Sequence, residues 1–429
     1  MNRFERHPVL TAVILIGLLA SALLFAAEWA LRPAGGSARD LPAKRFLAMR
    51  EWLPNSTHTY RTPKARYNDP AGPIDDSYTI AIDAQGFIKP SIRHAKPDFE
   101  IAFLGGSTTE CLYLRPKERF PARAGGLLEA RTGLKINALN AGRSGNHSMH
   151  SLVNMIGKVL PRRPRYAVLM HATNDIGWLG GYGTYWMNKK DIALVQRRDR
   201  GTTQLLRDLR DRTFPYTFRA LSRGWKALKF RLAEALSRGD PKGIAPSPET
   251  PPRAKAPLPA APPGPKELER RKILRENYEP ALRSFVALAK AWGVRPVLMT
   301  QMLAREGIGT GAGAEGGLLG AEELARGDFD AASFSSIHAY ANAIVAHVAE
   351  SEGALLIDLA GARDWQPGDV YDGLHLTPTG AERAAEMIAG AIAADLKARP
   401  PLRAPRRPRR SSDNLNRIDG RIFAERKDF

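Results

Sequence analysis

Ser107, His375 and Asp372 are residue types that together could activate a hydroxyl group for attack on an ester carbonyl. A serine hydroxyl is a weak nucleophile, so it needs a base, usually histidine. That imidazole in turn needs a carboxylate to hold its tautomer and to stabilise the imidazolium. Asp372 and His375 are three residues apart, and on a turn this separation lets the carboxylate fold back onto the ring. We therefore predict a single loop that carries both the acid and the base.

Three N–H groups could stabilise the negative charge that develops in such a reaction. They are the backbone N–H groups of Ser107 and Gly142 and the side-chain amide of Asn174, all close to glycines or other small residues. Preorganised donors of this kind are each worth roughly 10²–10³ in rate. Taken singly, these residues also fit a turn, a loop glycine and a helix cap. Jointly with the acid and base, they are the parts that ester hydrolysis by serine requires.

The residues that could do this chemistry follow predicted strands or precede the last predicted helix. Apolar runs predict five strands, at Glu100–Leu104, Lys135–Leu139, Tyr166–His171, Arg295–Thr300 and Ala354–Leu359. Helical patterns occur at Pro121–Arg131, Ser148–Val159, Glu267–Trp292 and Ala381–Lys397. Strands of this kind separated by helices indicate a doubly wound α/β domain with a parallel sheet covered on both faces. In such sheets, ligands bind beyond the carboxyl ends of the strands.

Four blocks of this sequence resemble those of the SGNH (GDSL-type) esterase/lipase superfamily. They are Gly105-Gly106-Ser107, Asn140-Ala141-Gly142, Thr173-Asn174-Asp175 and Asp372-Gly373-Leu374-His375. The resemblance implies that Ser107, Gly142, Asn174 and His375 are the name-giving residues and that Asp372 completes the triad. It also implies a flavodoxin-like three-layer α/β/α fold with a five-stranded parallel sheet and no metal, and we expect no cofactor. Two positions depart from the family pattern: Gly106 replaces the usual Asp, and Ala172 replaces a usual Gly.

The net charge of +20 is partly concentrated in the C-terminal segment, where residues 397–429 hold 11 basic and 4 acidic side chains. This segment lacks helical or strand periodicity, so we predict a disordered basic tail. No zinc-finger, RNP-like or recognition-helix pattern is present, and we expect no nucleic-acid partner. The single cysteine, Cys111, excludes an intramolecular disulfide framework, and we expect it to be a small core residue.

The N-terminal segment Val9–Ala27 contains 19 residues without a charge, preceded by Arg3 and Arg6. Such a length can cross a hydrocarbon core as a helix, and the flanking charges favour a cytoplasmic N-terminus. We predict an uncleaved signal anchor in a bacterial inner membrane, with the catalytic domain on the extracytoplasmic side. A cleaved signal peptide is the alternative, since Ala20-Ser21-Ala22 fits the small-residue pattern of a cleavage site.

The whole sequence divides into four predicted parts. We predict an N-terminus and anchor over residues 1–31, a β-rich preface over 32–97, an SGNH hydrolase domain over 98–396, and the basic tail over 397–429. The domain contains a proline-rich insertion at about 238–265, and a short amphipathic helix is expected at Leu41–Leu53 within the preface.

Two further clusters lie near the predicted site in the sequence. His147, His150 and His171 have no carboxylate spaced with them in a metal-binding motif, so we expect substrate contact or packing. Four aromatic residues could line a sugar- or acyl-binding cleft or pack in an ordinary loop; they are Trp178, Tyr182, Tyr185 and Trp186.

The sequence therefore predicts a membrane-anchored serine esterase. Its expected substrate is a carboxylic ester, with acetyl or another short acyl group on a cell-surface polysaccharide preferred by analogy with the family and from the predicted location. An acyltransferase that uses the same triad is one alternative. The other is a non-catalytic envelope protein that binds glycan or lipid on an SGNH scaffold.

Overall fold

The computed structural model describes residues 8–30, 44–62, 74–186, 193–198, 264–303, 329, 331–362 and 365–399. The chain divides into two compact units, Met1–Leu47 with Val195–Ala261 and Ala48–Leu194 with Pro262–Phe429. Almost all of the predicted proline-rich insertion and of the predicted basic tail lies outside the described residues.

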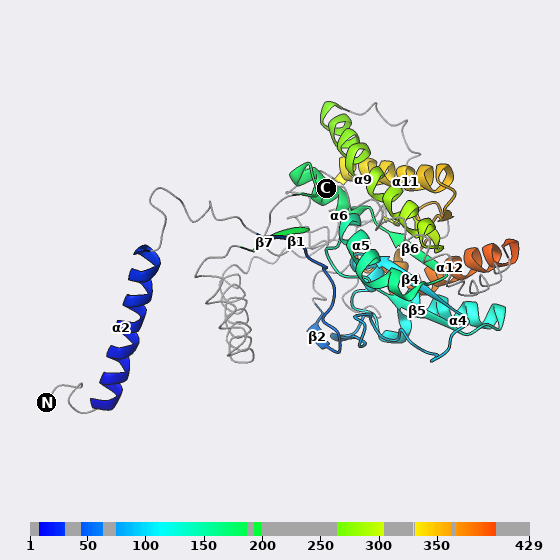
Figure 1. Cartoon of the computed structure of the whole chain (residues 1–429). Helices are drawn as coiled ribbons and strands as arrows, with labels where there is room; N and C mark the ends of the chain where they lie inside the picture. Colours follow the sequence, from blue (N-terminus) through cyan, green and yellow to red (C-terminus); the bar gives the residue numbers. More distant parts are fainter. Residues whose placement is uncertain are drawn as a thin grey trace, which may run out of the picture. The chain divides into compact units, whose positions relative to one another are not determined.

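In the first unit, helix α2 spans the 23 residues Pro8–Ala30 (Figure 1). It includes the predicted anchor segment Val9–Ala27, but the structure describes a continuous run of its side chains only from Thr11 to Leu23. Within the described residues, no helix has both the length and the apolar character that crossing a membrane requires. The passage of this segment through a membrane therefore stays a prediction.

The same unit contains a short two-stranded sheet. Strand β1, Lys44–Leu47, pairs antiparallel with strand β7, Val195–Arg198. The predicted amphipathic helix at Leu41–Leu53 is therefore wrong. The partner strand lies far along the chain, and pairing of this kind overrides the local helical pattern.

The second unit is built around a five-stranded sheet in which all strands are parallel. Its strands are β4 (Phe99–Gly105), β5 (Ile136–Asn140), β6 (Tyr166–Met170), β8 (Arg295–Met299) and β9 (Leu355–Ile357). Their order in the sheet is β5-β4-β6-β8-β9. This is the flavodoxin-like arrangement, in which the second strand is added on one side of the first strand and all later strands on the other side. The predicted α/β fold with a five-stranded parallel sheet is confirmed.

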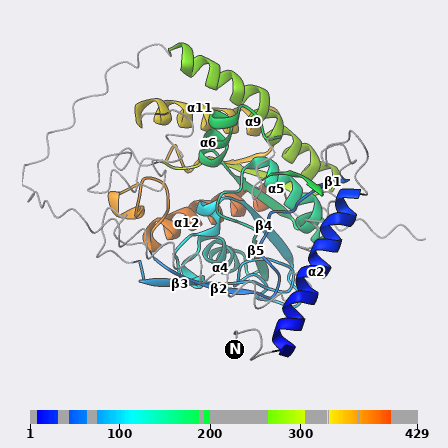
Figure 2. The ribbon, with the colours of Figure 1, turned by 90° about the vertical axis from the view of Figure 1, so that its left-hand side faces the viewer.

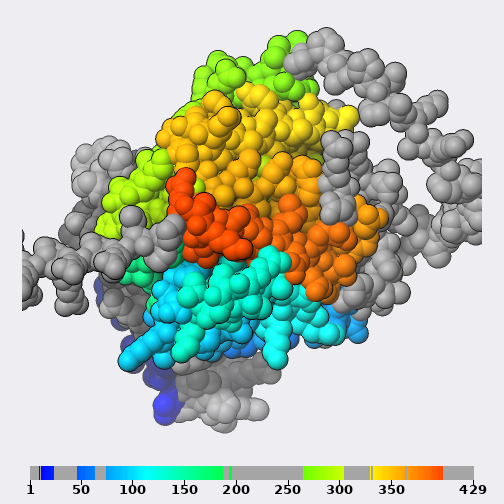
Figure 3. Space-filling model, turned by 90° about the vertical axis from the view of Figure 1, so that its right-hand side faces the viewer, coloured from blue at the N-terminus to red at the C-terminus, as the bar shows by residue number. Residues whose placement is uncertain are grey.

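Helices cover both faces of this sheet. Figure 2 shows α6 (Thr173–Tyr182), α9 (Pro265–Ala291) and α11 (Ala331–Ser351) on one side of β4 and β5, and α4 (Phe120–Thr132) on the other. Helices α4 (Phe120–Thr132) and α12 (Pro378–Ala398) pack together on one face (Figure 3). The other face is covered by α5 (Ser148–Asn154), α6 (Thr173–Tyr182), α9 (Pro265–Ala291) and α11 (Ala331–Ser351).

Strand β4 contributes to a separate hydrophobic core on each face. Phe103 packs with Phe120 and Ile388 on the α4/α12 side, whereas its neighbour Leu104 packs with Phe285 on the α9/α11 side. Since successive side chains of a strand point to opposite faces, burial on both sides requires a continuous apolar run. Every residue of β4 is buried. Ser107 lies two residues after the end of this strand, at the carboxyl edge of the sheet.

An antiparallel strand pair precedes the parallel sheet. Strand β2, Thr57–Arg61, pairs with β3, Ser77–Ala81. The chain after β3 then joins the end of β5, because the Ile88 N–H donates to the Asn140 carbonyl at 2.9 Å. The buried side chain of Arg119 donates to the carbonyls of Thr79 and Lys89. These polar contacts attach the strand pair to the α/β domain.

Four shorter helical segments complete the described structure. They are the 3₁₀-helices Pro116–Glu118, Leu160–Arg162 and Pro367–Asp369 and the π-helix Met155–Val159.

Candidate active site

Ser107 is the first residue of the short helix α3, Ser107–Glu110, which follows β4 directly. Two glycines make the turn between them possible. A Cβ on Gly105 would lie 2.8 Å from the carbonyl oxygen of Met170, and one on Gly106 would overlap the Asn174 amide nitrogen. The departure from the family pattern at Gly106 thus has a steric explanation, because a side chain at this position would displace Asn174.

The structure brings Ser107, His375 and Asp372 into one chain of hydrogen bonds. His375 Nε2 lies 2.6 Å from Ser107 Oγ, and His375 Nδ1 lies 2.9 Å from Asp372 Oδ2. An ionised carboxylate only accepts hydrogen bonds, so Nδ1 carries the proton and Nε2 is left to accept the serine hydroxyl hydrogen. His375 and Asp372 are buried, whereas Ser107 is partly exposed. This arrangement can deprotonate the serine as it attacks.

The loop between β9 and α12 holds the acid and base through its own backbone. Asp372 Oδ1 accepts the backbone N–H groups of Leu374 and His375 at 2.8 and 2.7 Å. The Tyr371 ring stacks on the imidazole, with centroids 5.7 Å apart and planes 11° apart. Thr377 then caps α12 by accepting the Gly380 N–H. The predicted loop that carries both residues is present, and its own hydrogen bonds orient both side chains.

Asn174 lies in the first turn of α6, next to the glycine turn that precedes Ser107. Its Nδ2 donates to the backbone carbonyl of Asn146 at 2.7 Å. A primary amide has two N–H groups, so this bond fixes the amide while one N–H is left over. The Ser107 N–H, at the first position of a helix, has no acceptor within that helix.

Gly142 is the one predicted donor whose N–H is already engaged. It donates to Asn140 Oδ1 at 2.8 Å, while Asn140 Nδ2 donates to the Thr109 carbonyl at 2.9 Å. Gly142 also packs directly on α3, since a Cβ here would lie 2.6 Å from the carbonyl carbon of Thr109. Its N–H could reach an oxyanion only by sharing or exchanging its present acceptor.

Glu110 is a buried carboxylate that the sequence analysis did not identify. It accepts hydrogen bonds from the backbone N–H and the hydroxyl of Ser144, so it connects the helix that begins at Ser107 to the loop after β5. Burial raises the pKa of this carboxyl, and hydrogen bonds from Ser144 oppose the rise. Its position three residues after Ser107 carried no signal that distinguishes it from an ordinary helix residue.

Gln301 is a second residue that the sequence analysis missed. It lies two residues after the end of β8, where its Nε2 donates to Thr108 Oγ1 at 3.0 Å and its Oε1 accepts the Thr173 N–H at 2.9 Å. Thr108 and Thr173 are the chain neighbours of Ser107 and Asn174. Gln301 therefore links the two segments that carry these groups. Its position at the carboxyl end of a predicted strand was the only available signal.

The three histidines lie in a buried cluster on the α5/α6 side. The rings of His147 and His150 are 3.7 Å apart, and His171 contacts Asp175 and Ser151. Burial lowers the pKa of His171 to about 3 and raises the pKa of Asp175 to about 6. Across the described residues, no group of His, Cys, Asp or Glu is arranged to hold a metal ion.

The predicted aromatic cluster is divided by the structure. Trp178 and Tyr185 are buried beside His147, whereas Trp186 is 59% exposed. Tyr182 is partly buried and packs against Trp178. Cys111 is a buried free cysteine, as expected for a core residue, and burial raises the pKa of its thiol to about 12.

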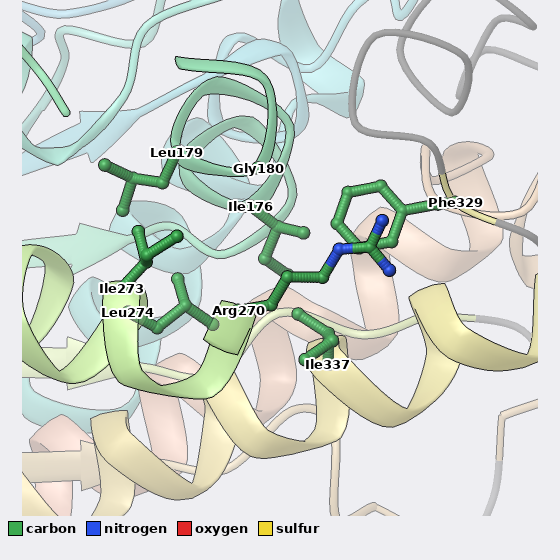
Figure 4. A pocket seen from close by; sticks show the side chains of 8 residues that line it. All are labelled: Ile176, Leu179, Gly180, Arg270, Ile273, Leu274, Phe329 and Ile337. Carbon is green, nitrogen blue, oxygen red and sulfur yellow. The ribbon is translucent and has the colours of Figure 1, made fainter. Parts of the chain in front are cut away.

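A small cavity lies away from the triad (Figure 4). It is lined by residues of α6, α9 and α11 together with Phe329, over which the Arg270 guanidinium lies at 3.9 Å from the ring centroid. Its volume is about 10 Å³, room for about one water molecule. None of the residues predicted to act in catalysis lines it.

Comparison with known proteins identifies the class to which this site belongs. The model of the GDSL-like lipase/acylhydrolase family matches residues 103–383, so the chain belongs to that family. The protein is an SGNH-type ester hydrolase. The search of curated protein sequences found no match.

Solved structures give a more distant likeness. The acetylxylan esterase Axe2 from Geobacillus stearothermophilus is 16% identical, with 70% of this chain and 94% of that chain covered and a TM-score of 0.35. The alpha/beta hydrolase LAE5 from the metagenome of Lake Arreo is also 16% identical, with 70% and 94% covered and a TM-score of 0.34.

Proposed function

We propose that the protein hydrolyses short-chain carboxylic esters with Ser107 as nucleophile, His375 as general base and acid, and Asp372 as the residue that orients His375. The observation that carries this proposal is the continuous hydrogen-bond chain from Asp372 through His375 to Ser107. Ser107 is also the only one of the three that is partly exposed. A substrate carbonyl can therefore reach the hydroxyl, whereas Asp372 and His375 are buried.

The reaction proceeds in two halves. Ser107 Oγ attacks the ester carbonyl while its proton passes to His375 Nε2, and the resulting imidazolium is stabilised by Asp372. Collapse of the tetrahedral intermediate breaks the bond to the alcohol, which takes the proton from His375 and leaves. Water then attacks the acyl-enzyme with His375 as base, which releases the carboxylic acid and regenerates Ser107.

The negative oxygen of both intermediates is assigned to the Ser107 N–H and the unused N–H of the Asn174 amide. Both groups lie beside the Gly105-Gly106 turn, and hydrogen bonds that form fully only in the transition state raise kcat. Gly142 contributes a third donor if its N–H turns from Asn140 Oδ1 when the oxyanion forms.

The experiment compares the full chain with its Ser107→Ala variant in hydrolysis of p-nitrophenyl acetate and in labelling by a fluorophosphonate probe. Labelling at Ser107 in peptide mapping, with acetate release lost in the variant, is the expected result. Ser77→Ala is the matched control, because Ser77 is an exposed serine on β3. Equal turnover by wild type and Ser107→Ala would contradict the assignment.

For the natural substrate, we propose an acetyl or other short acyl ester on a cell-surface glycan. This choice follows from the family and from the predicted extracytoplasmic position of the domain. Incubation with an acetylated polysaccharide should release free acetate. Appearance of the acyl group on an added acceptor hydroxyl, without free acetate, would instead identify an acyltransferase.

We further propose that Val9–Ala27 anchors the chain in the bacterial inner membrane. The support is the uncharged run of 19 residues after Arg3 and Arg6. The full chain should sediment with membranes and resist extraction by carbonate. Release by carbonate, or a mature protein that begins after the Ala20-Ser21-Ala22 site, would contradict the uncleaved anchor.

A further inference from the structure

Arg50 lies outside the residues matched by the family model, yet it contacts the loop that follows β5. Its Nη1 donates to the carbonyl of Ser144 at 2.7 Å and to Asn146 Oδ1 at 2.6 Å. In return, Asn146 Nδ2 and Asn154 Nδ2 donate to the Arg50 carbonyl, both at 3.2 Å. Arg50 therefore clamps Asn146 through both its side chain and its backbone.

The same Asn146 holds the proposed oxyanion donor. Its backbone carbonyl accepts the Asn174 amide at 2.7 Å, and Asn146 itself is fully buried. A continuous sequence of hydrogen bonds thus runs from Arg50 to Asn146 and from Asn146 to Asn174. The direction of the free Asn174 N–H depends on where the Asn146 carbonyl is held.

The loop after β5 also contacts α3, the helix that begins at Ser107. Glu110 accepts both the N–H and the hydroxyl of Ser144. Arg143 extends the contact, because it donates to the Glu51 carbonyl and lies 5.4 Å from the Trp52 ring centroid. The loop after β5 therefore contacts both α3 and the segment Arg50–Trp52.

We propose that Arg50 is a positioning residue for the oxyanion hole and acts on the reaction through Asn146 and Asn174. The proposal rests on the proposed esterase function. It gives the segment before β2 a role in catalysis, since this segment supplies the group that orients a donor. The guanidinium is suited to the task because it presents several N–H groups in a fixed plane and stays charged when largely buried.

A positioning role predicts a specific kinetic signature. Arg50→Ala should lower kcat for p-nitrophenyl acetate about 10- to 100-fold and change KM by less than about 2-fold, since the lost interaction acts in the transition state. Arg50→Lys should recover part of the loss, because an ammonium can hold one of the two acceptors. Arg115→Ala is the matched control: it removes an exposed ion pair to Asp75 and should leave both constants unchanged.

The decisive measurement is a double-mutant cycle between Arg50→Ala and Asn174→Ala. If Arg50 acts through the amide, it should cost nothing further once Asn174 is absent. Additive losses in kcat would overturn the proposal, as would a folded Arg50→Ala variant with full kcat. Asn146→Ala provides a second route if Arg50→Ala does not fold. It removes the side-chain acceptor but keeps the carbonyl, and it should give the same non-additive loss with Asn174→Ala.

The two proposals fail in different ways. A wild-type enzyme that does not turn over the ester would reject the proposed function. An active, Ser107-dependent enzyme with an additive cycle would reject only the role of Arg50.

Discussion

The two sides of Ser107 are built by different means. On the acid–base side, Asp372 and His375 come from one loop and are joined by hydrogen bonds between residues two or three positions apart. On the oxyanion side, the groups come from separate segments: helix α3, the loop after β5, the start of α6, the end of β8 and the segment before β2.

The two sides also differ in how their polar groups are hydrogen-bonded before a substrate binds. The proposed triad forms one continuous hydrogen-bond chain from Asp372 through His375 to Ser107. On the oxyanion side, the Gly142 N–H and one of the two Asn174 amide N–H groups instead donate within the protein, to Asn140 and to the Asn146 carbonyl. We infer that the acid–base side depends on local chain geometry and the oxyanion side on long-range packing. Mutations distant from the serine should therefore act mainly through the oxyanion side.

The largest expected effect tests the acid–base side. Asp372→Asn should lower kcat by about 10⁴-fold, because an amide at this position favours the wrong imidazole tautomer. The fold should be retained, since the Asn oxygen can still accept the N–H groups of Leu374 and His375. Steady-state kinetics with p-nitrophenyl acetate, together with a thermal melt, would check this. A loss below about tenfold would mean that Asp372 does not orient the base.

A smaller effect is expected on the oxyanion side. Asn174→Ala should lower kcat by about 10²–10³-fold with little change in KM, because one donor to the oxyanion is lost. Measurement of kcat and KM on the same ester separates this from a binding defect. Asn277→Ala is the control, since among the residues that the structure describes the Asn277 side chain on α9 bonds only to the helix carbonyl of Ile273. A rise in KM at constant kcat would show that the amide contacts the ground state instead.

Gly142→Ala should affect stability as well as rate. The added methyl would meet the backbone of Thr109 and Glu110, which no side-chain rotation relieves, and overpacking of this kind costs about 1–3 kcal/mol. The loop must move away from α3, so a drop in melting temperature should accompany a loss of kcat. Gly177→Ala on α6 has open space around its Cβ, so it should leave kcat unchanged and should not lower the melting temperature, because Ala is favoured over Gly inside a helix. An unaltered melt for Gly142→Ala would show that the loop is more adaptable than its contacts suggest.

The contrast between the two sides also explains what the sequence could predict. The strands follow from apolar runs, and the pairing of Asp372 with His375 follows from a three-residue spacing, both of which are local signals; Ser107 follows from the Gly105-Gly106-Ser107 block that resembles the family. Leu41–Leu53 was wrongly expected to be helical because β1 pairs with a strand far along the chain.

Arg50 and Gln301 could not be identified from the sequence, because the partners of their side chains lie at least 94 and 128 positions away. Both act through hydrogen bonds that exist only once the sheet has formed. A local pattern predicts the groups that react, whereas the groups that hold them in place depend on the tertiary structure.

The last prediction concerns acid, which should weaken the hydrogen bonds that hold Gln301 on the oxyanion side. Asn342 on α11 holds both backbone groups of Gln301, at 2.9 and 2.8 Å, and its Nδ2 lies 3.3 Å from His338 Nδ1. Burial lowers the pKa of His338 to about 4. The neutral ring can accept the Asn342 amide hydrogen, whereas the protonated ring can only donate.

The sign of the pH dependence follows from this shift. The unfolded chain binds a proton at His338 near the ordinary pKa of 6.5, and the folded chain does so only near 4. The contribution of His338 to the free energy of unfolding is therefore at its maximum above pH 6.5 and falls as the pH drops towards 4. Its limiting slope is about 1.4 kcal/mol per pH unit. His171, whose pKa is lowered to about 3, acts in the same direction, and Asp175, whose pKa is raised to about 6, acts in the opposite one. Melting temperatures from pH 7 to 4.5 should fall less steeply for His338→Gln than for wild type, because the amide oxygen still accepts from Asn342 but takes up no proton. Parallel profiles for the two proteins would assign the acid sensitivity to other groups and leave the link from His338 to Gln301 without a role in it.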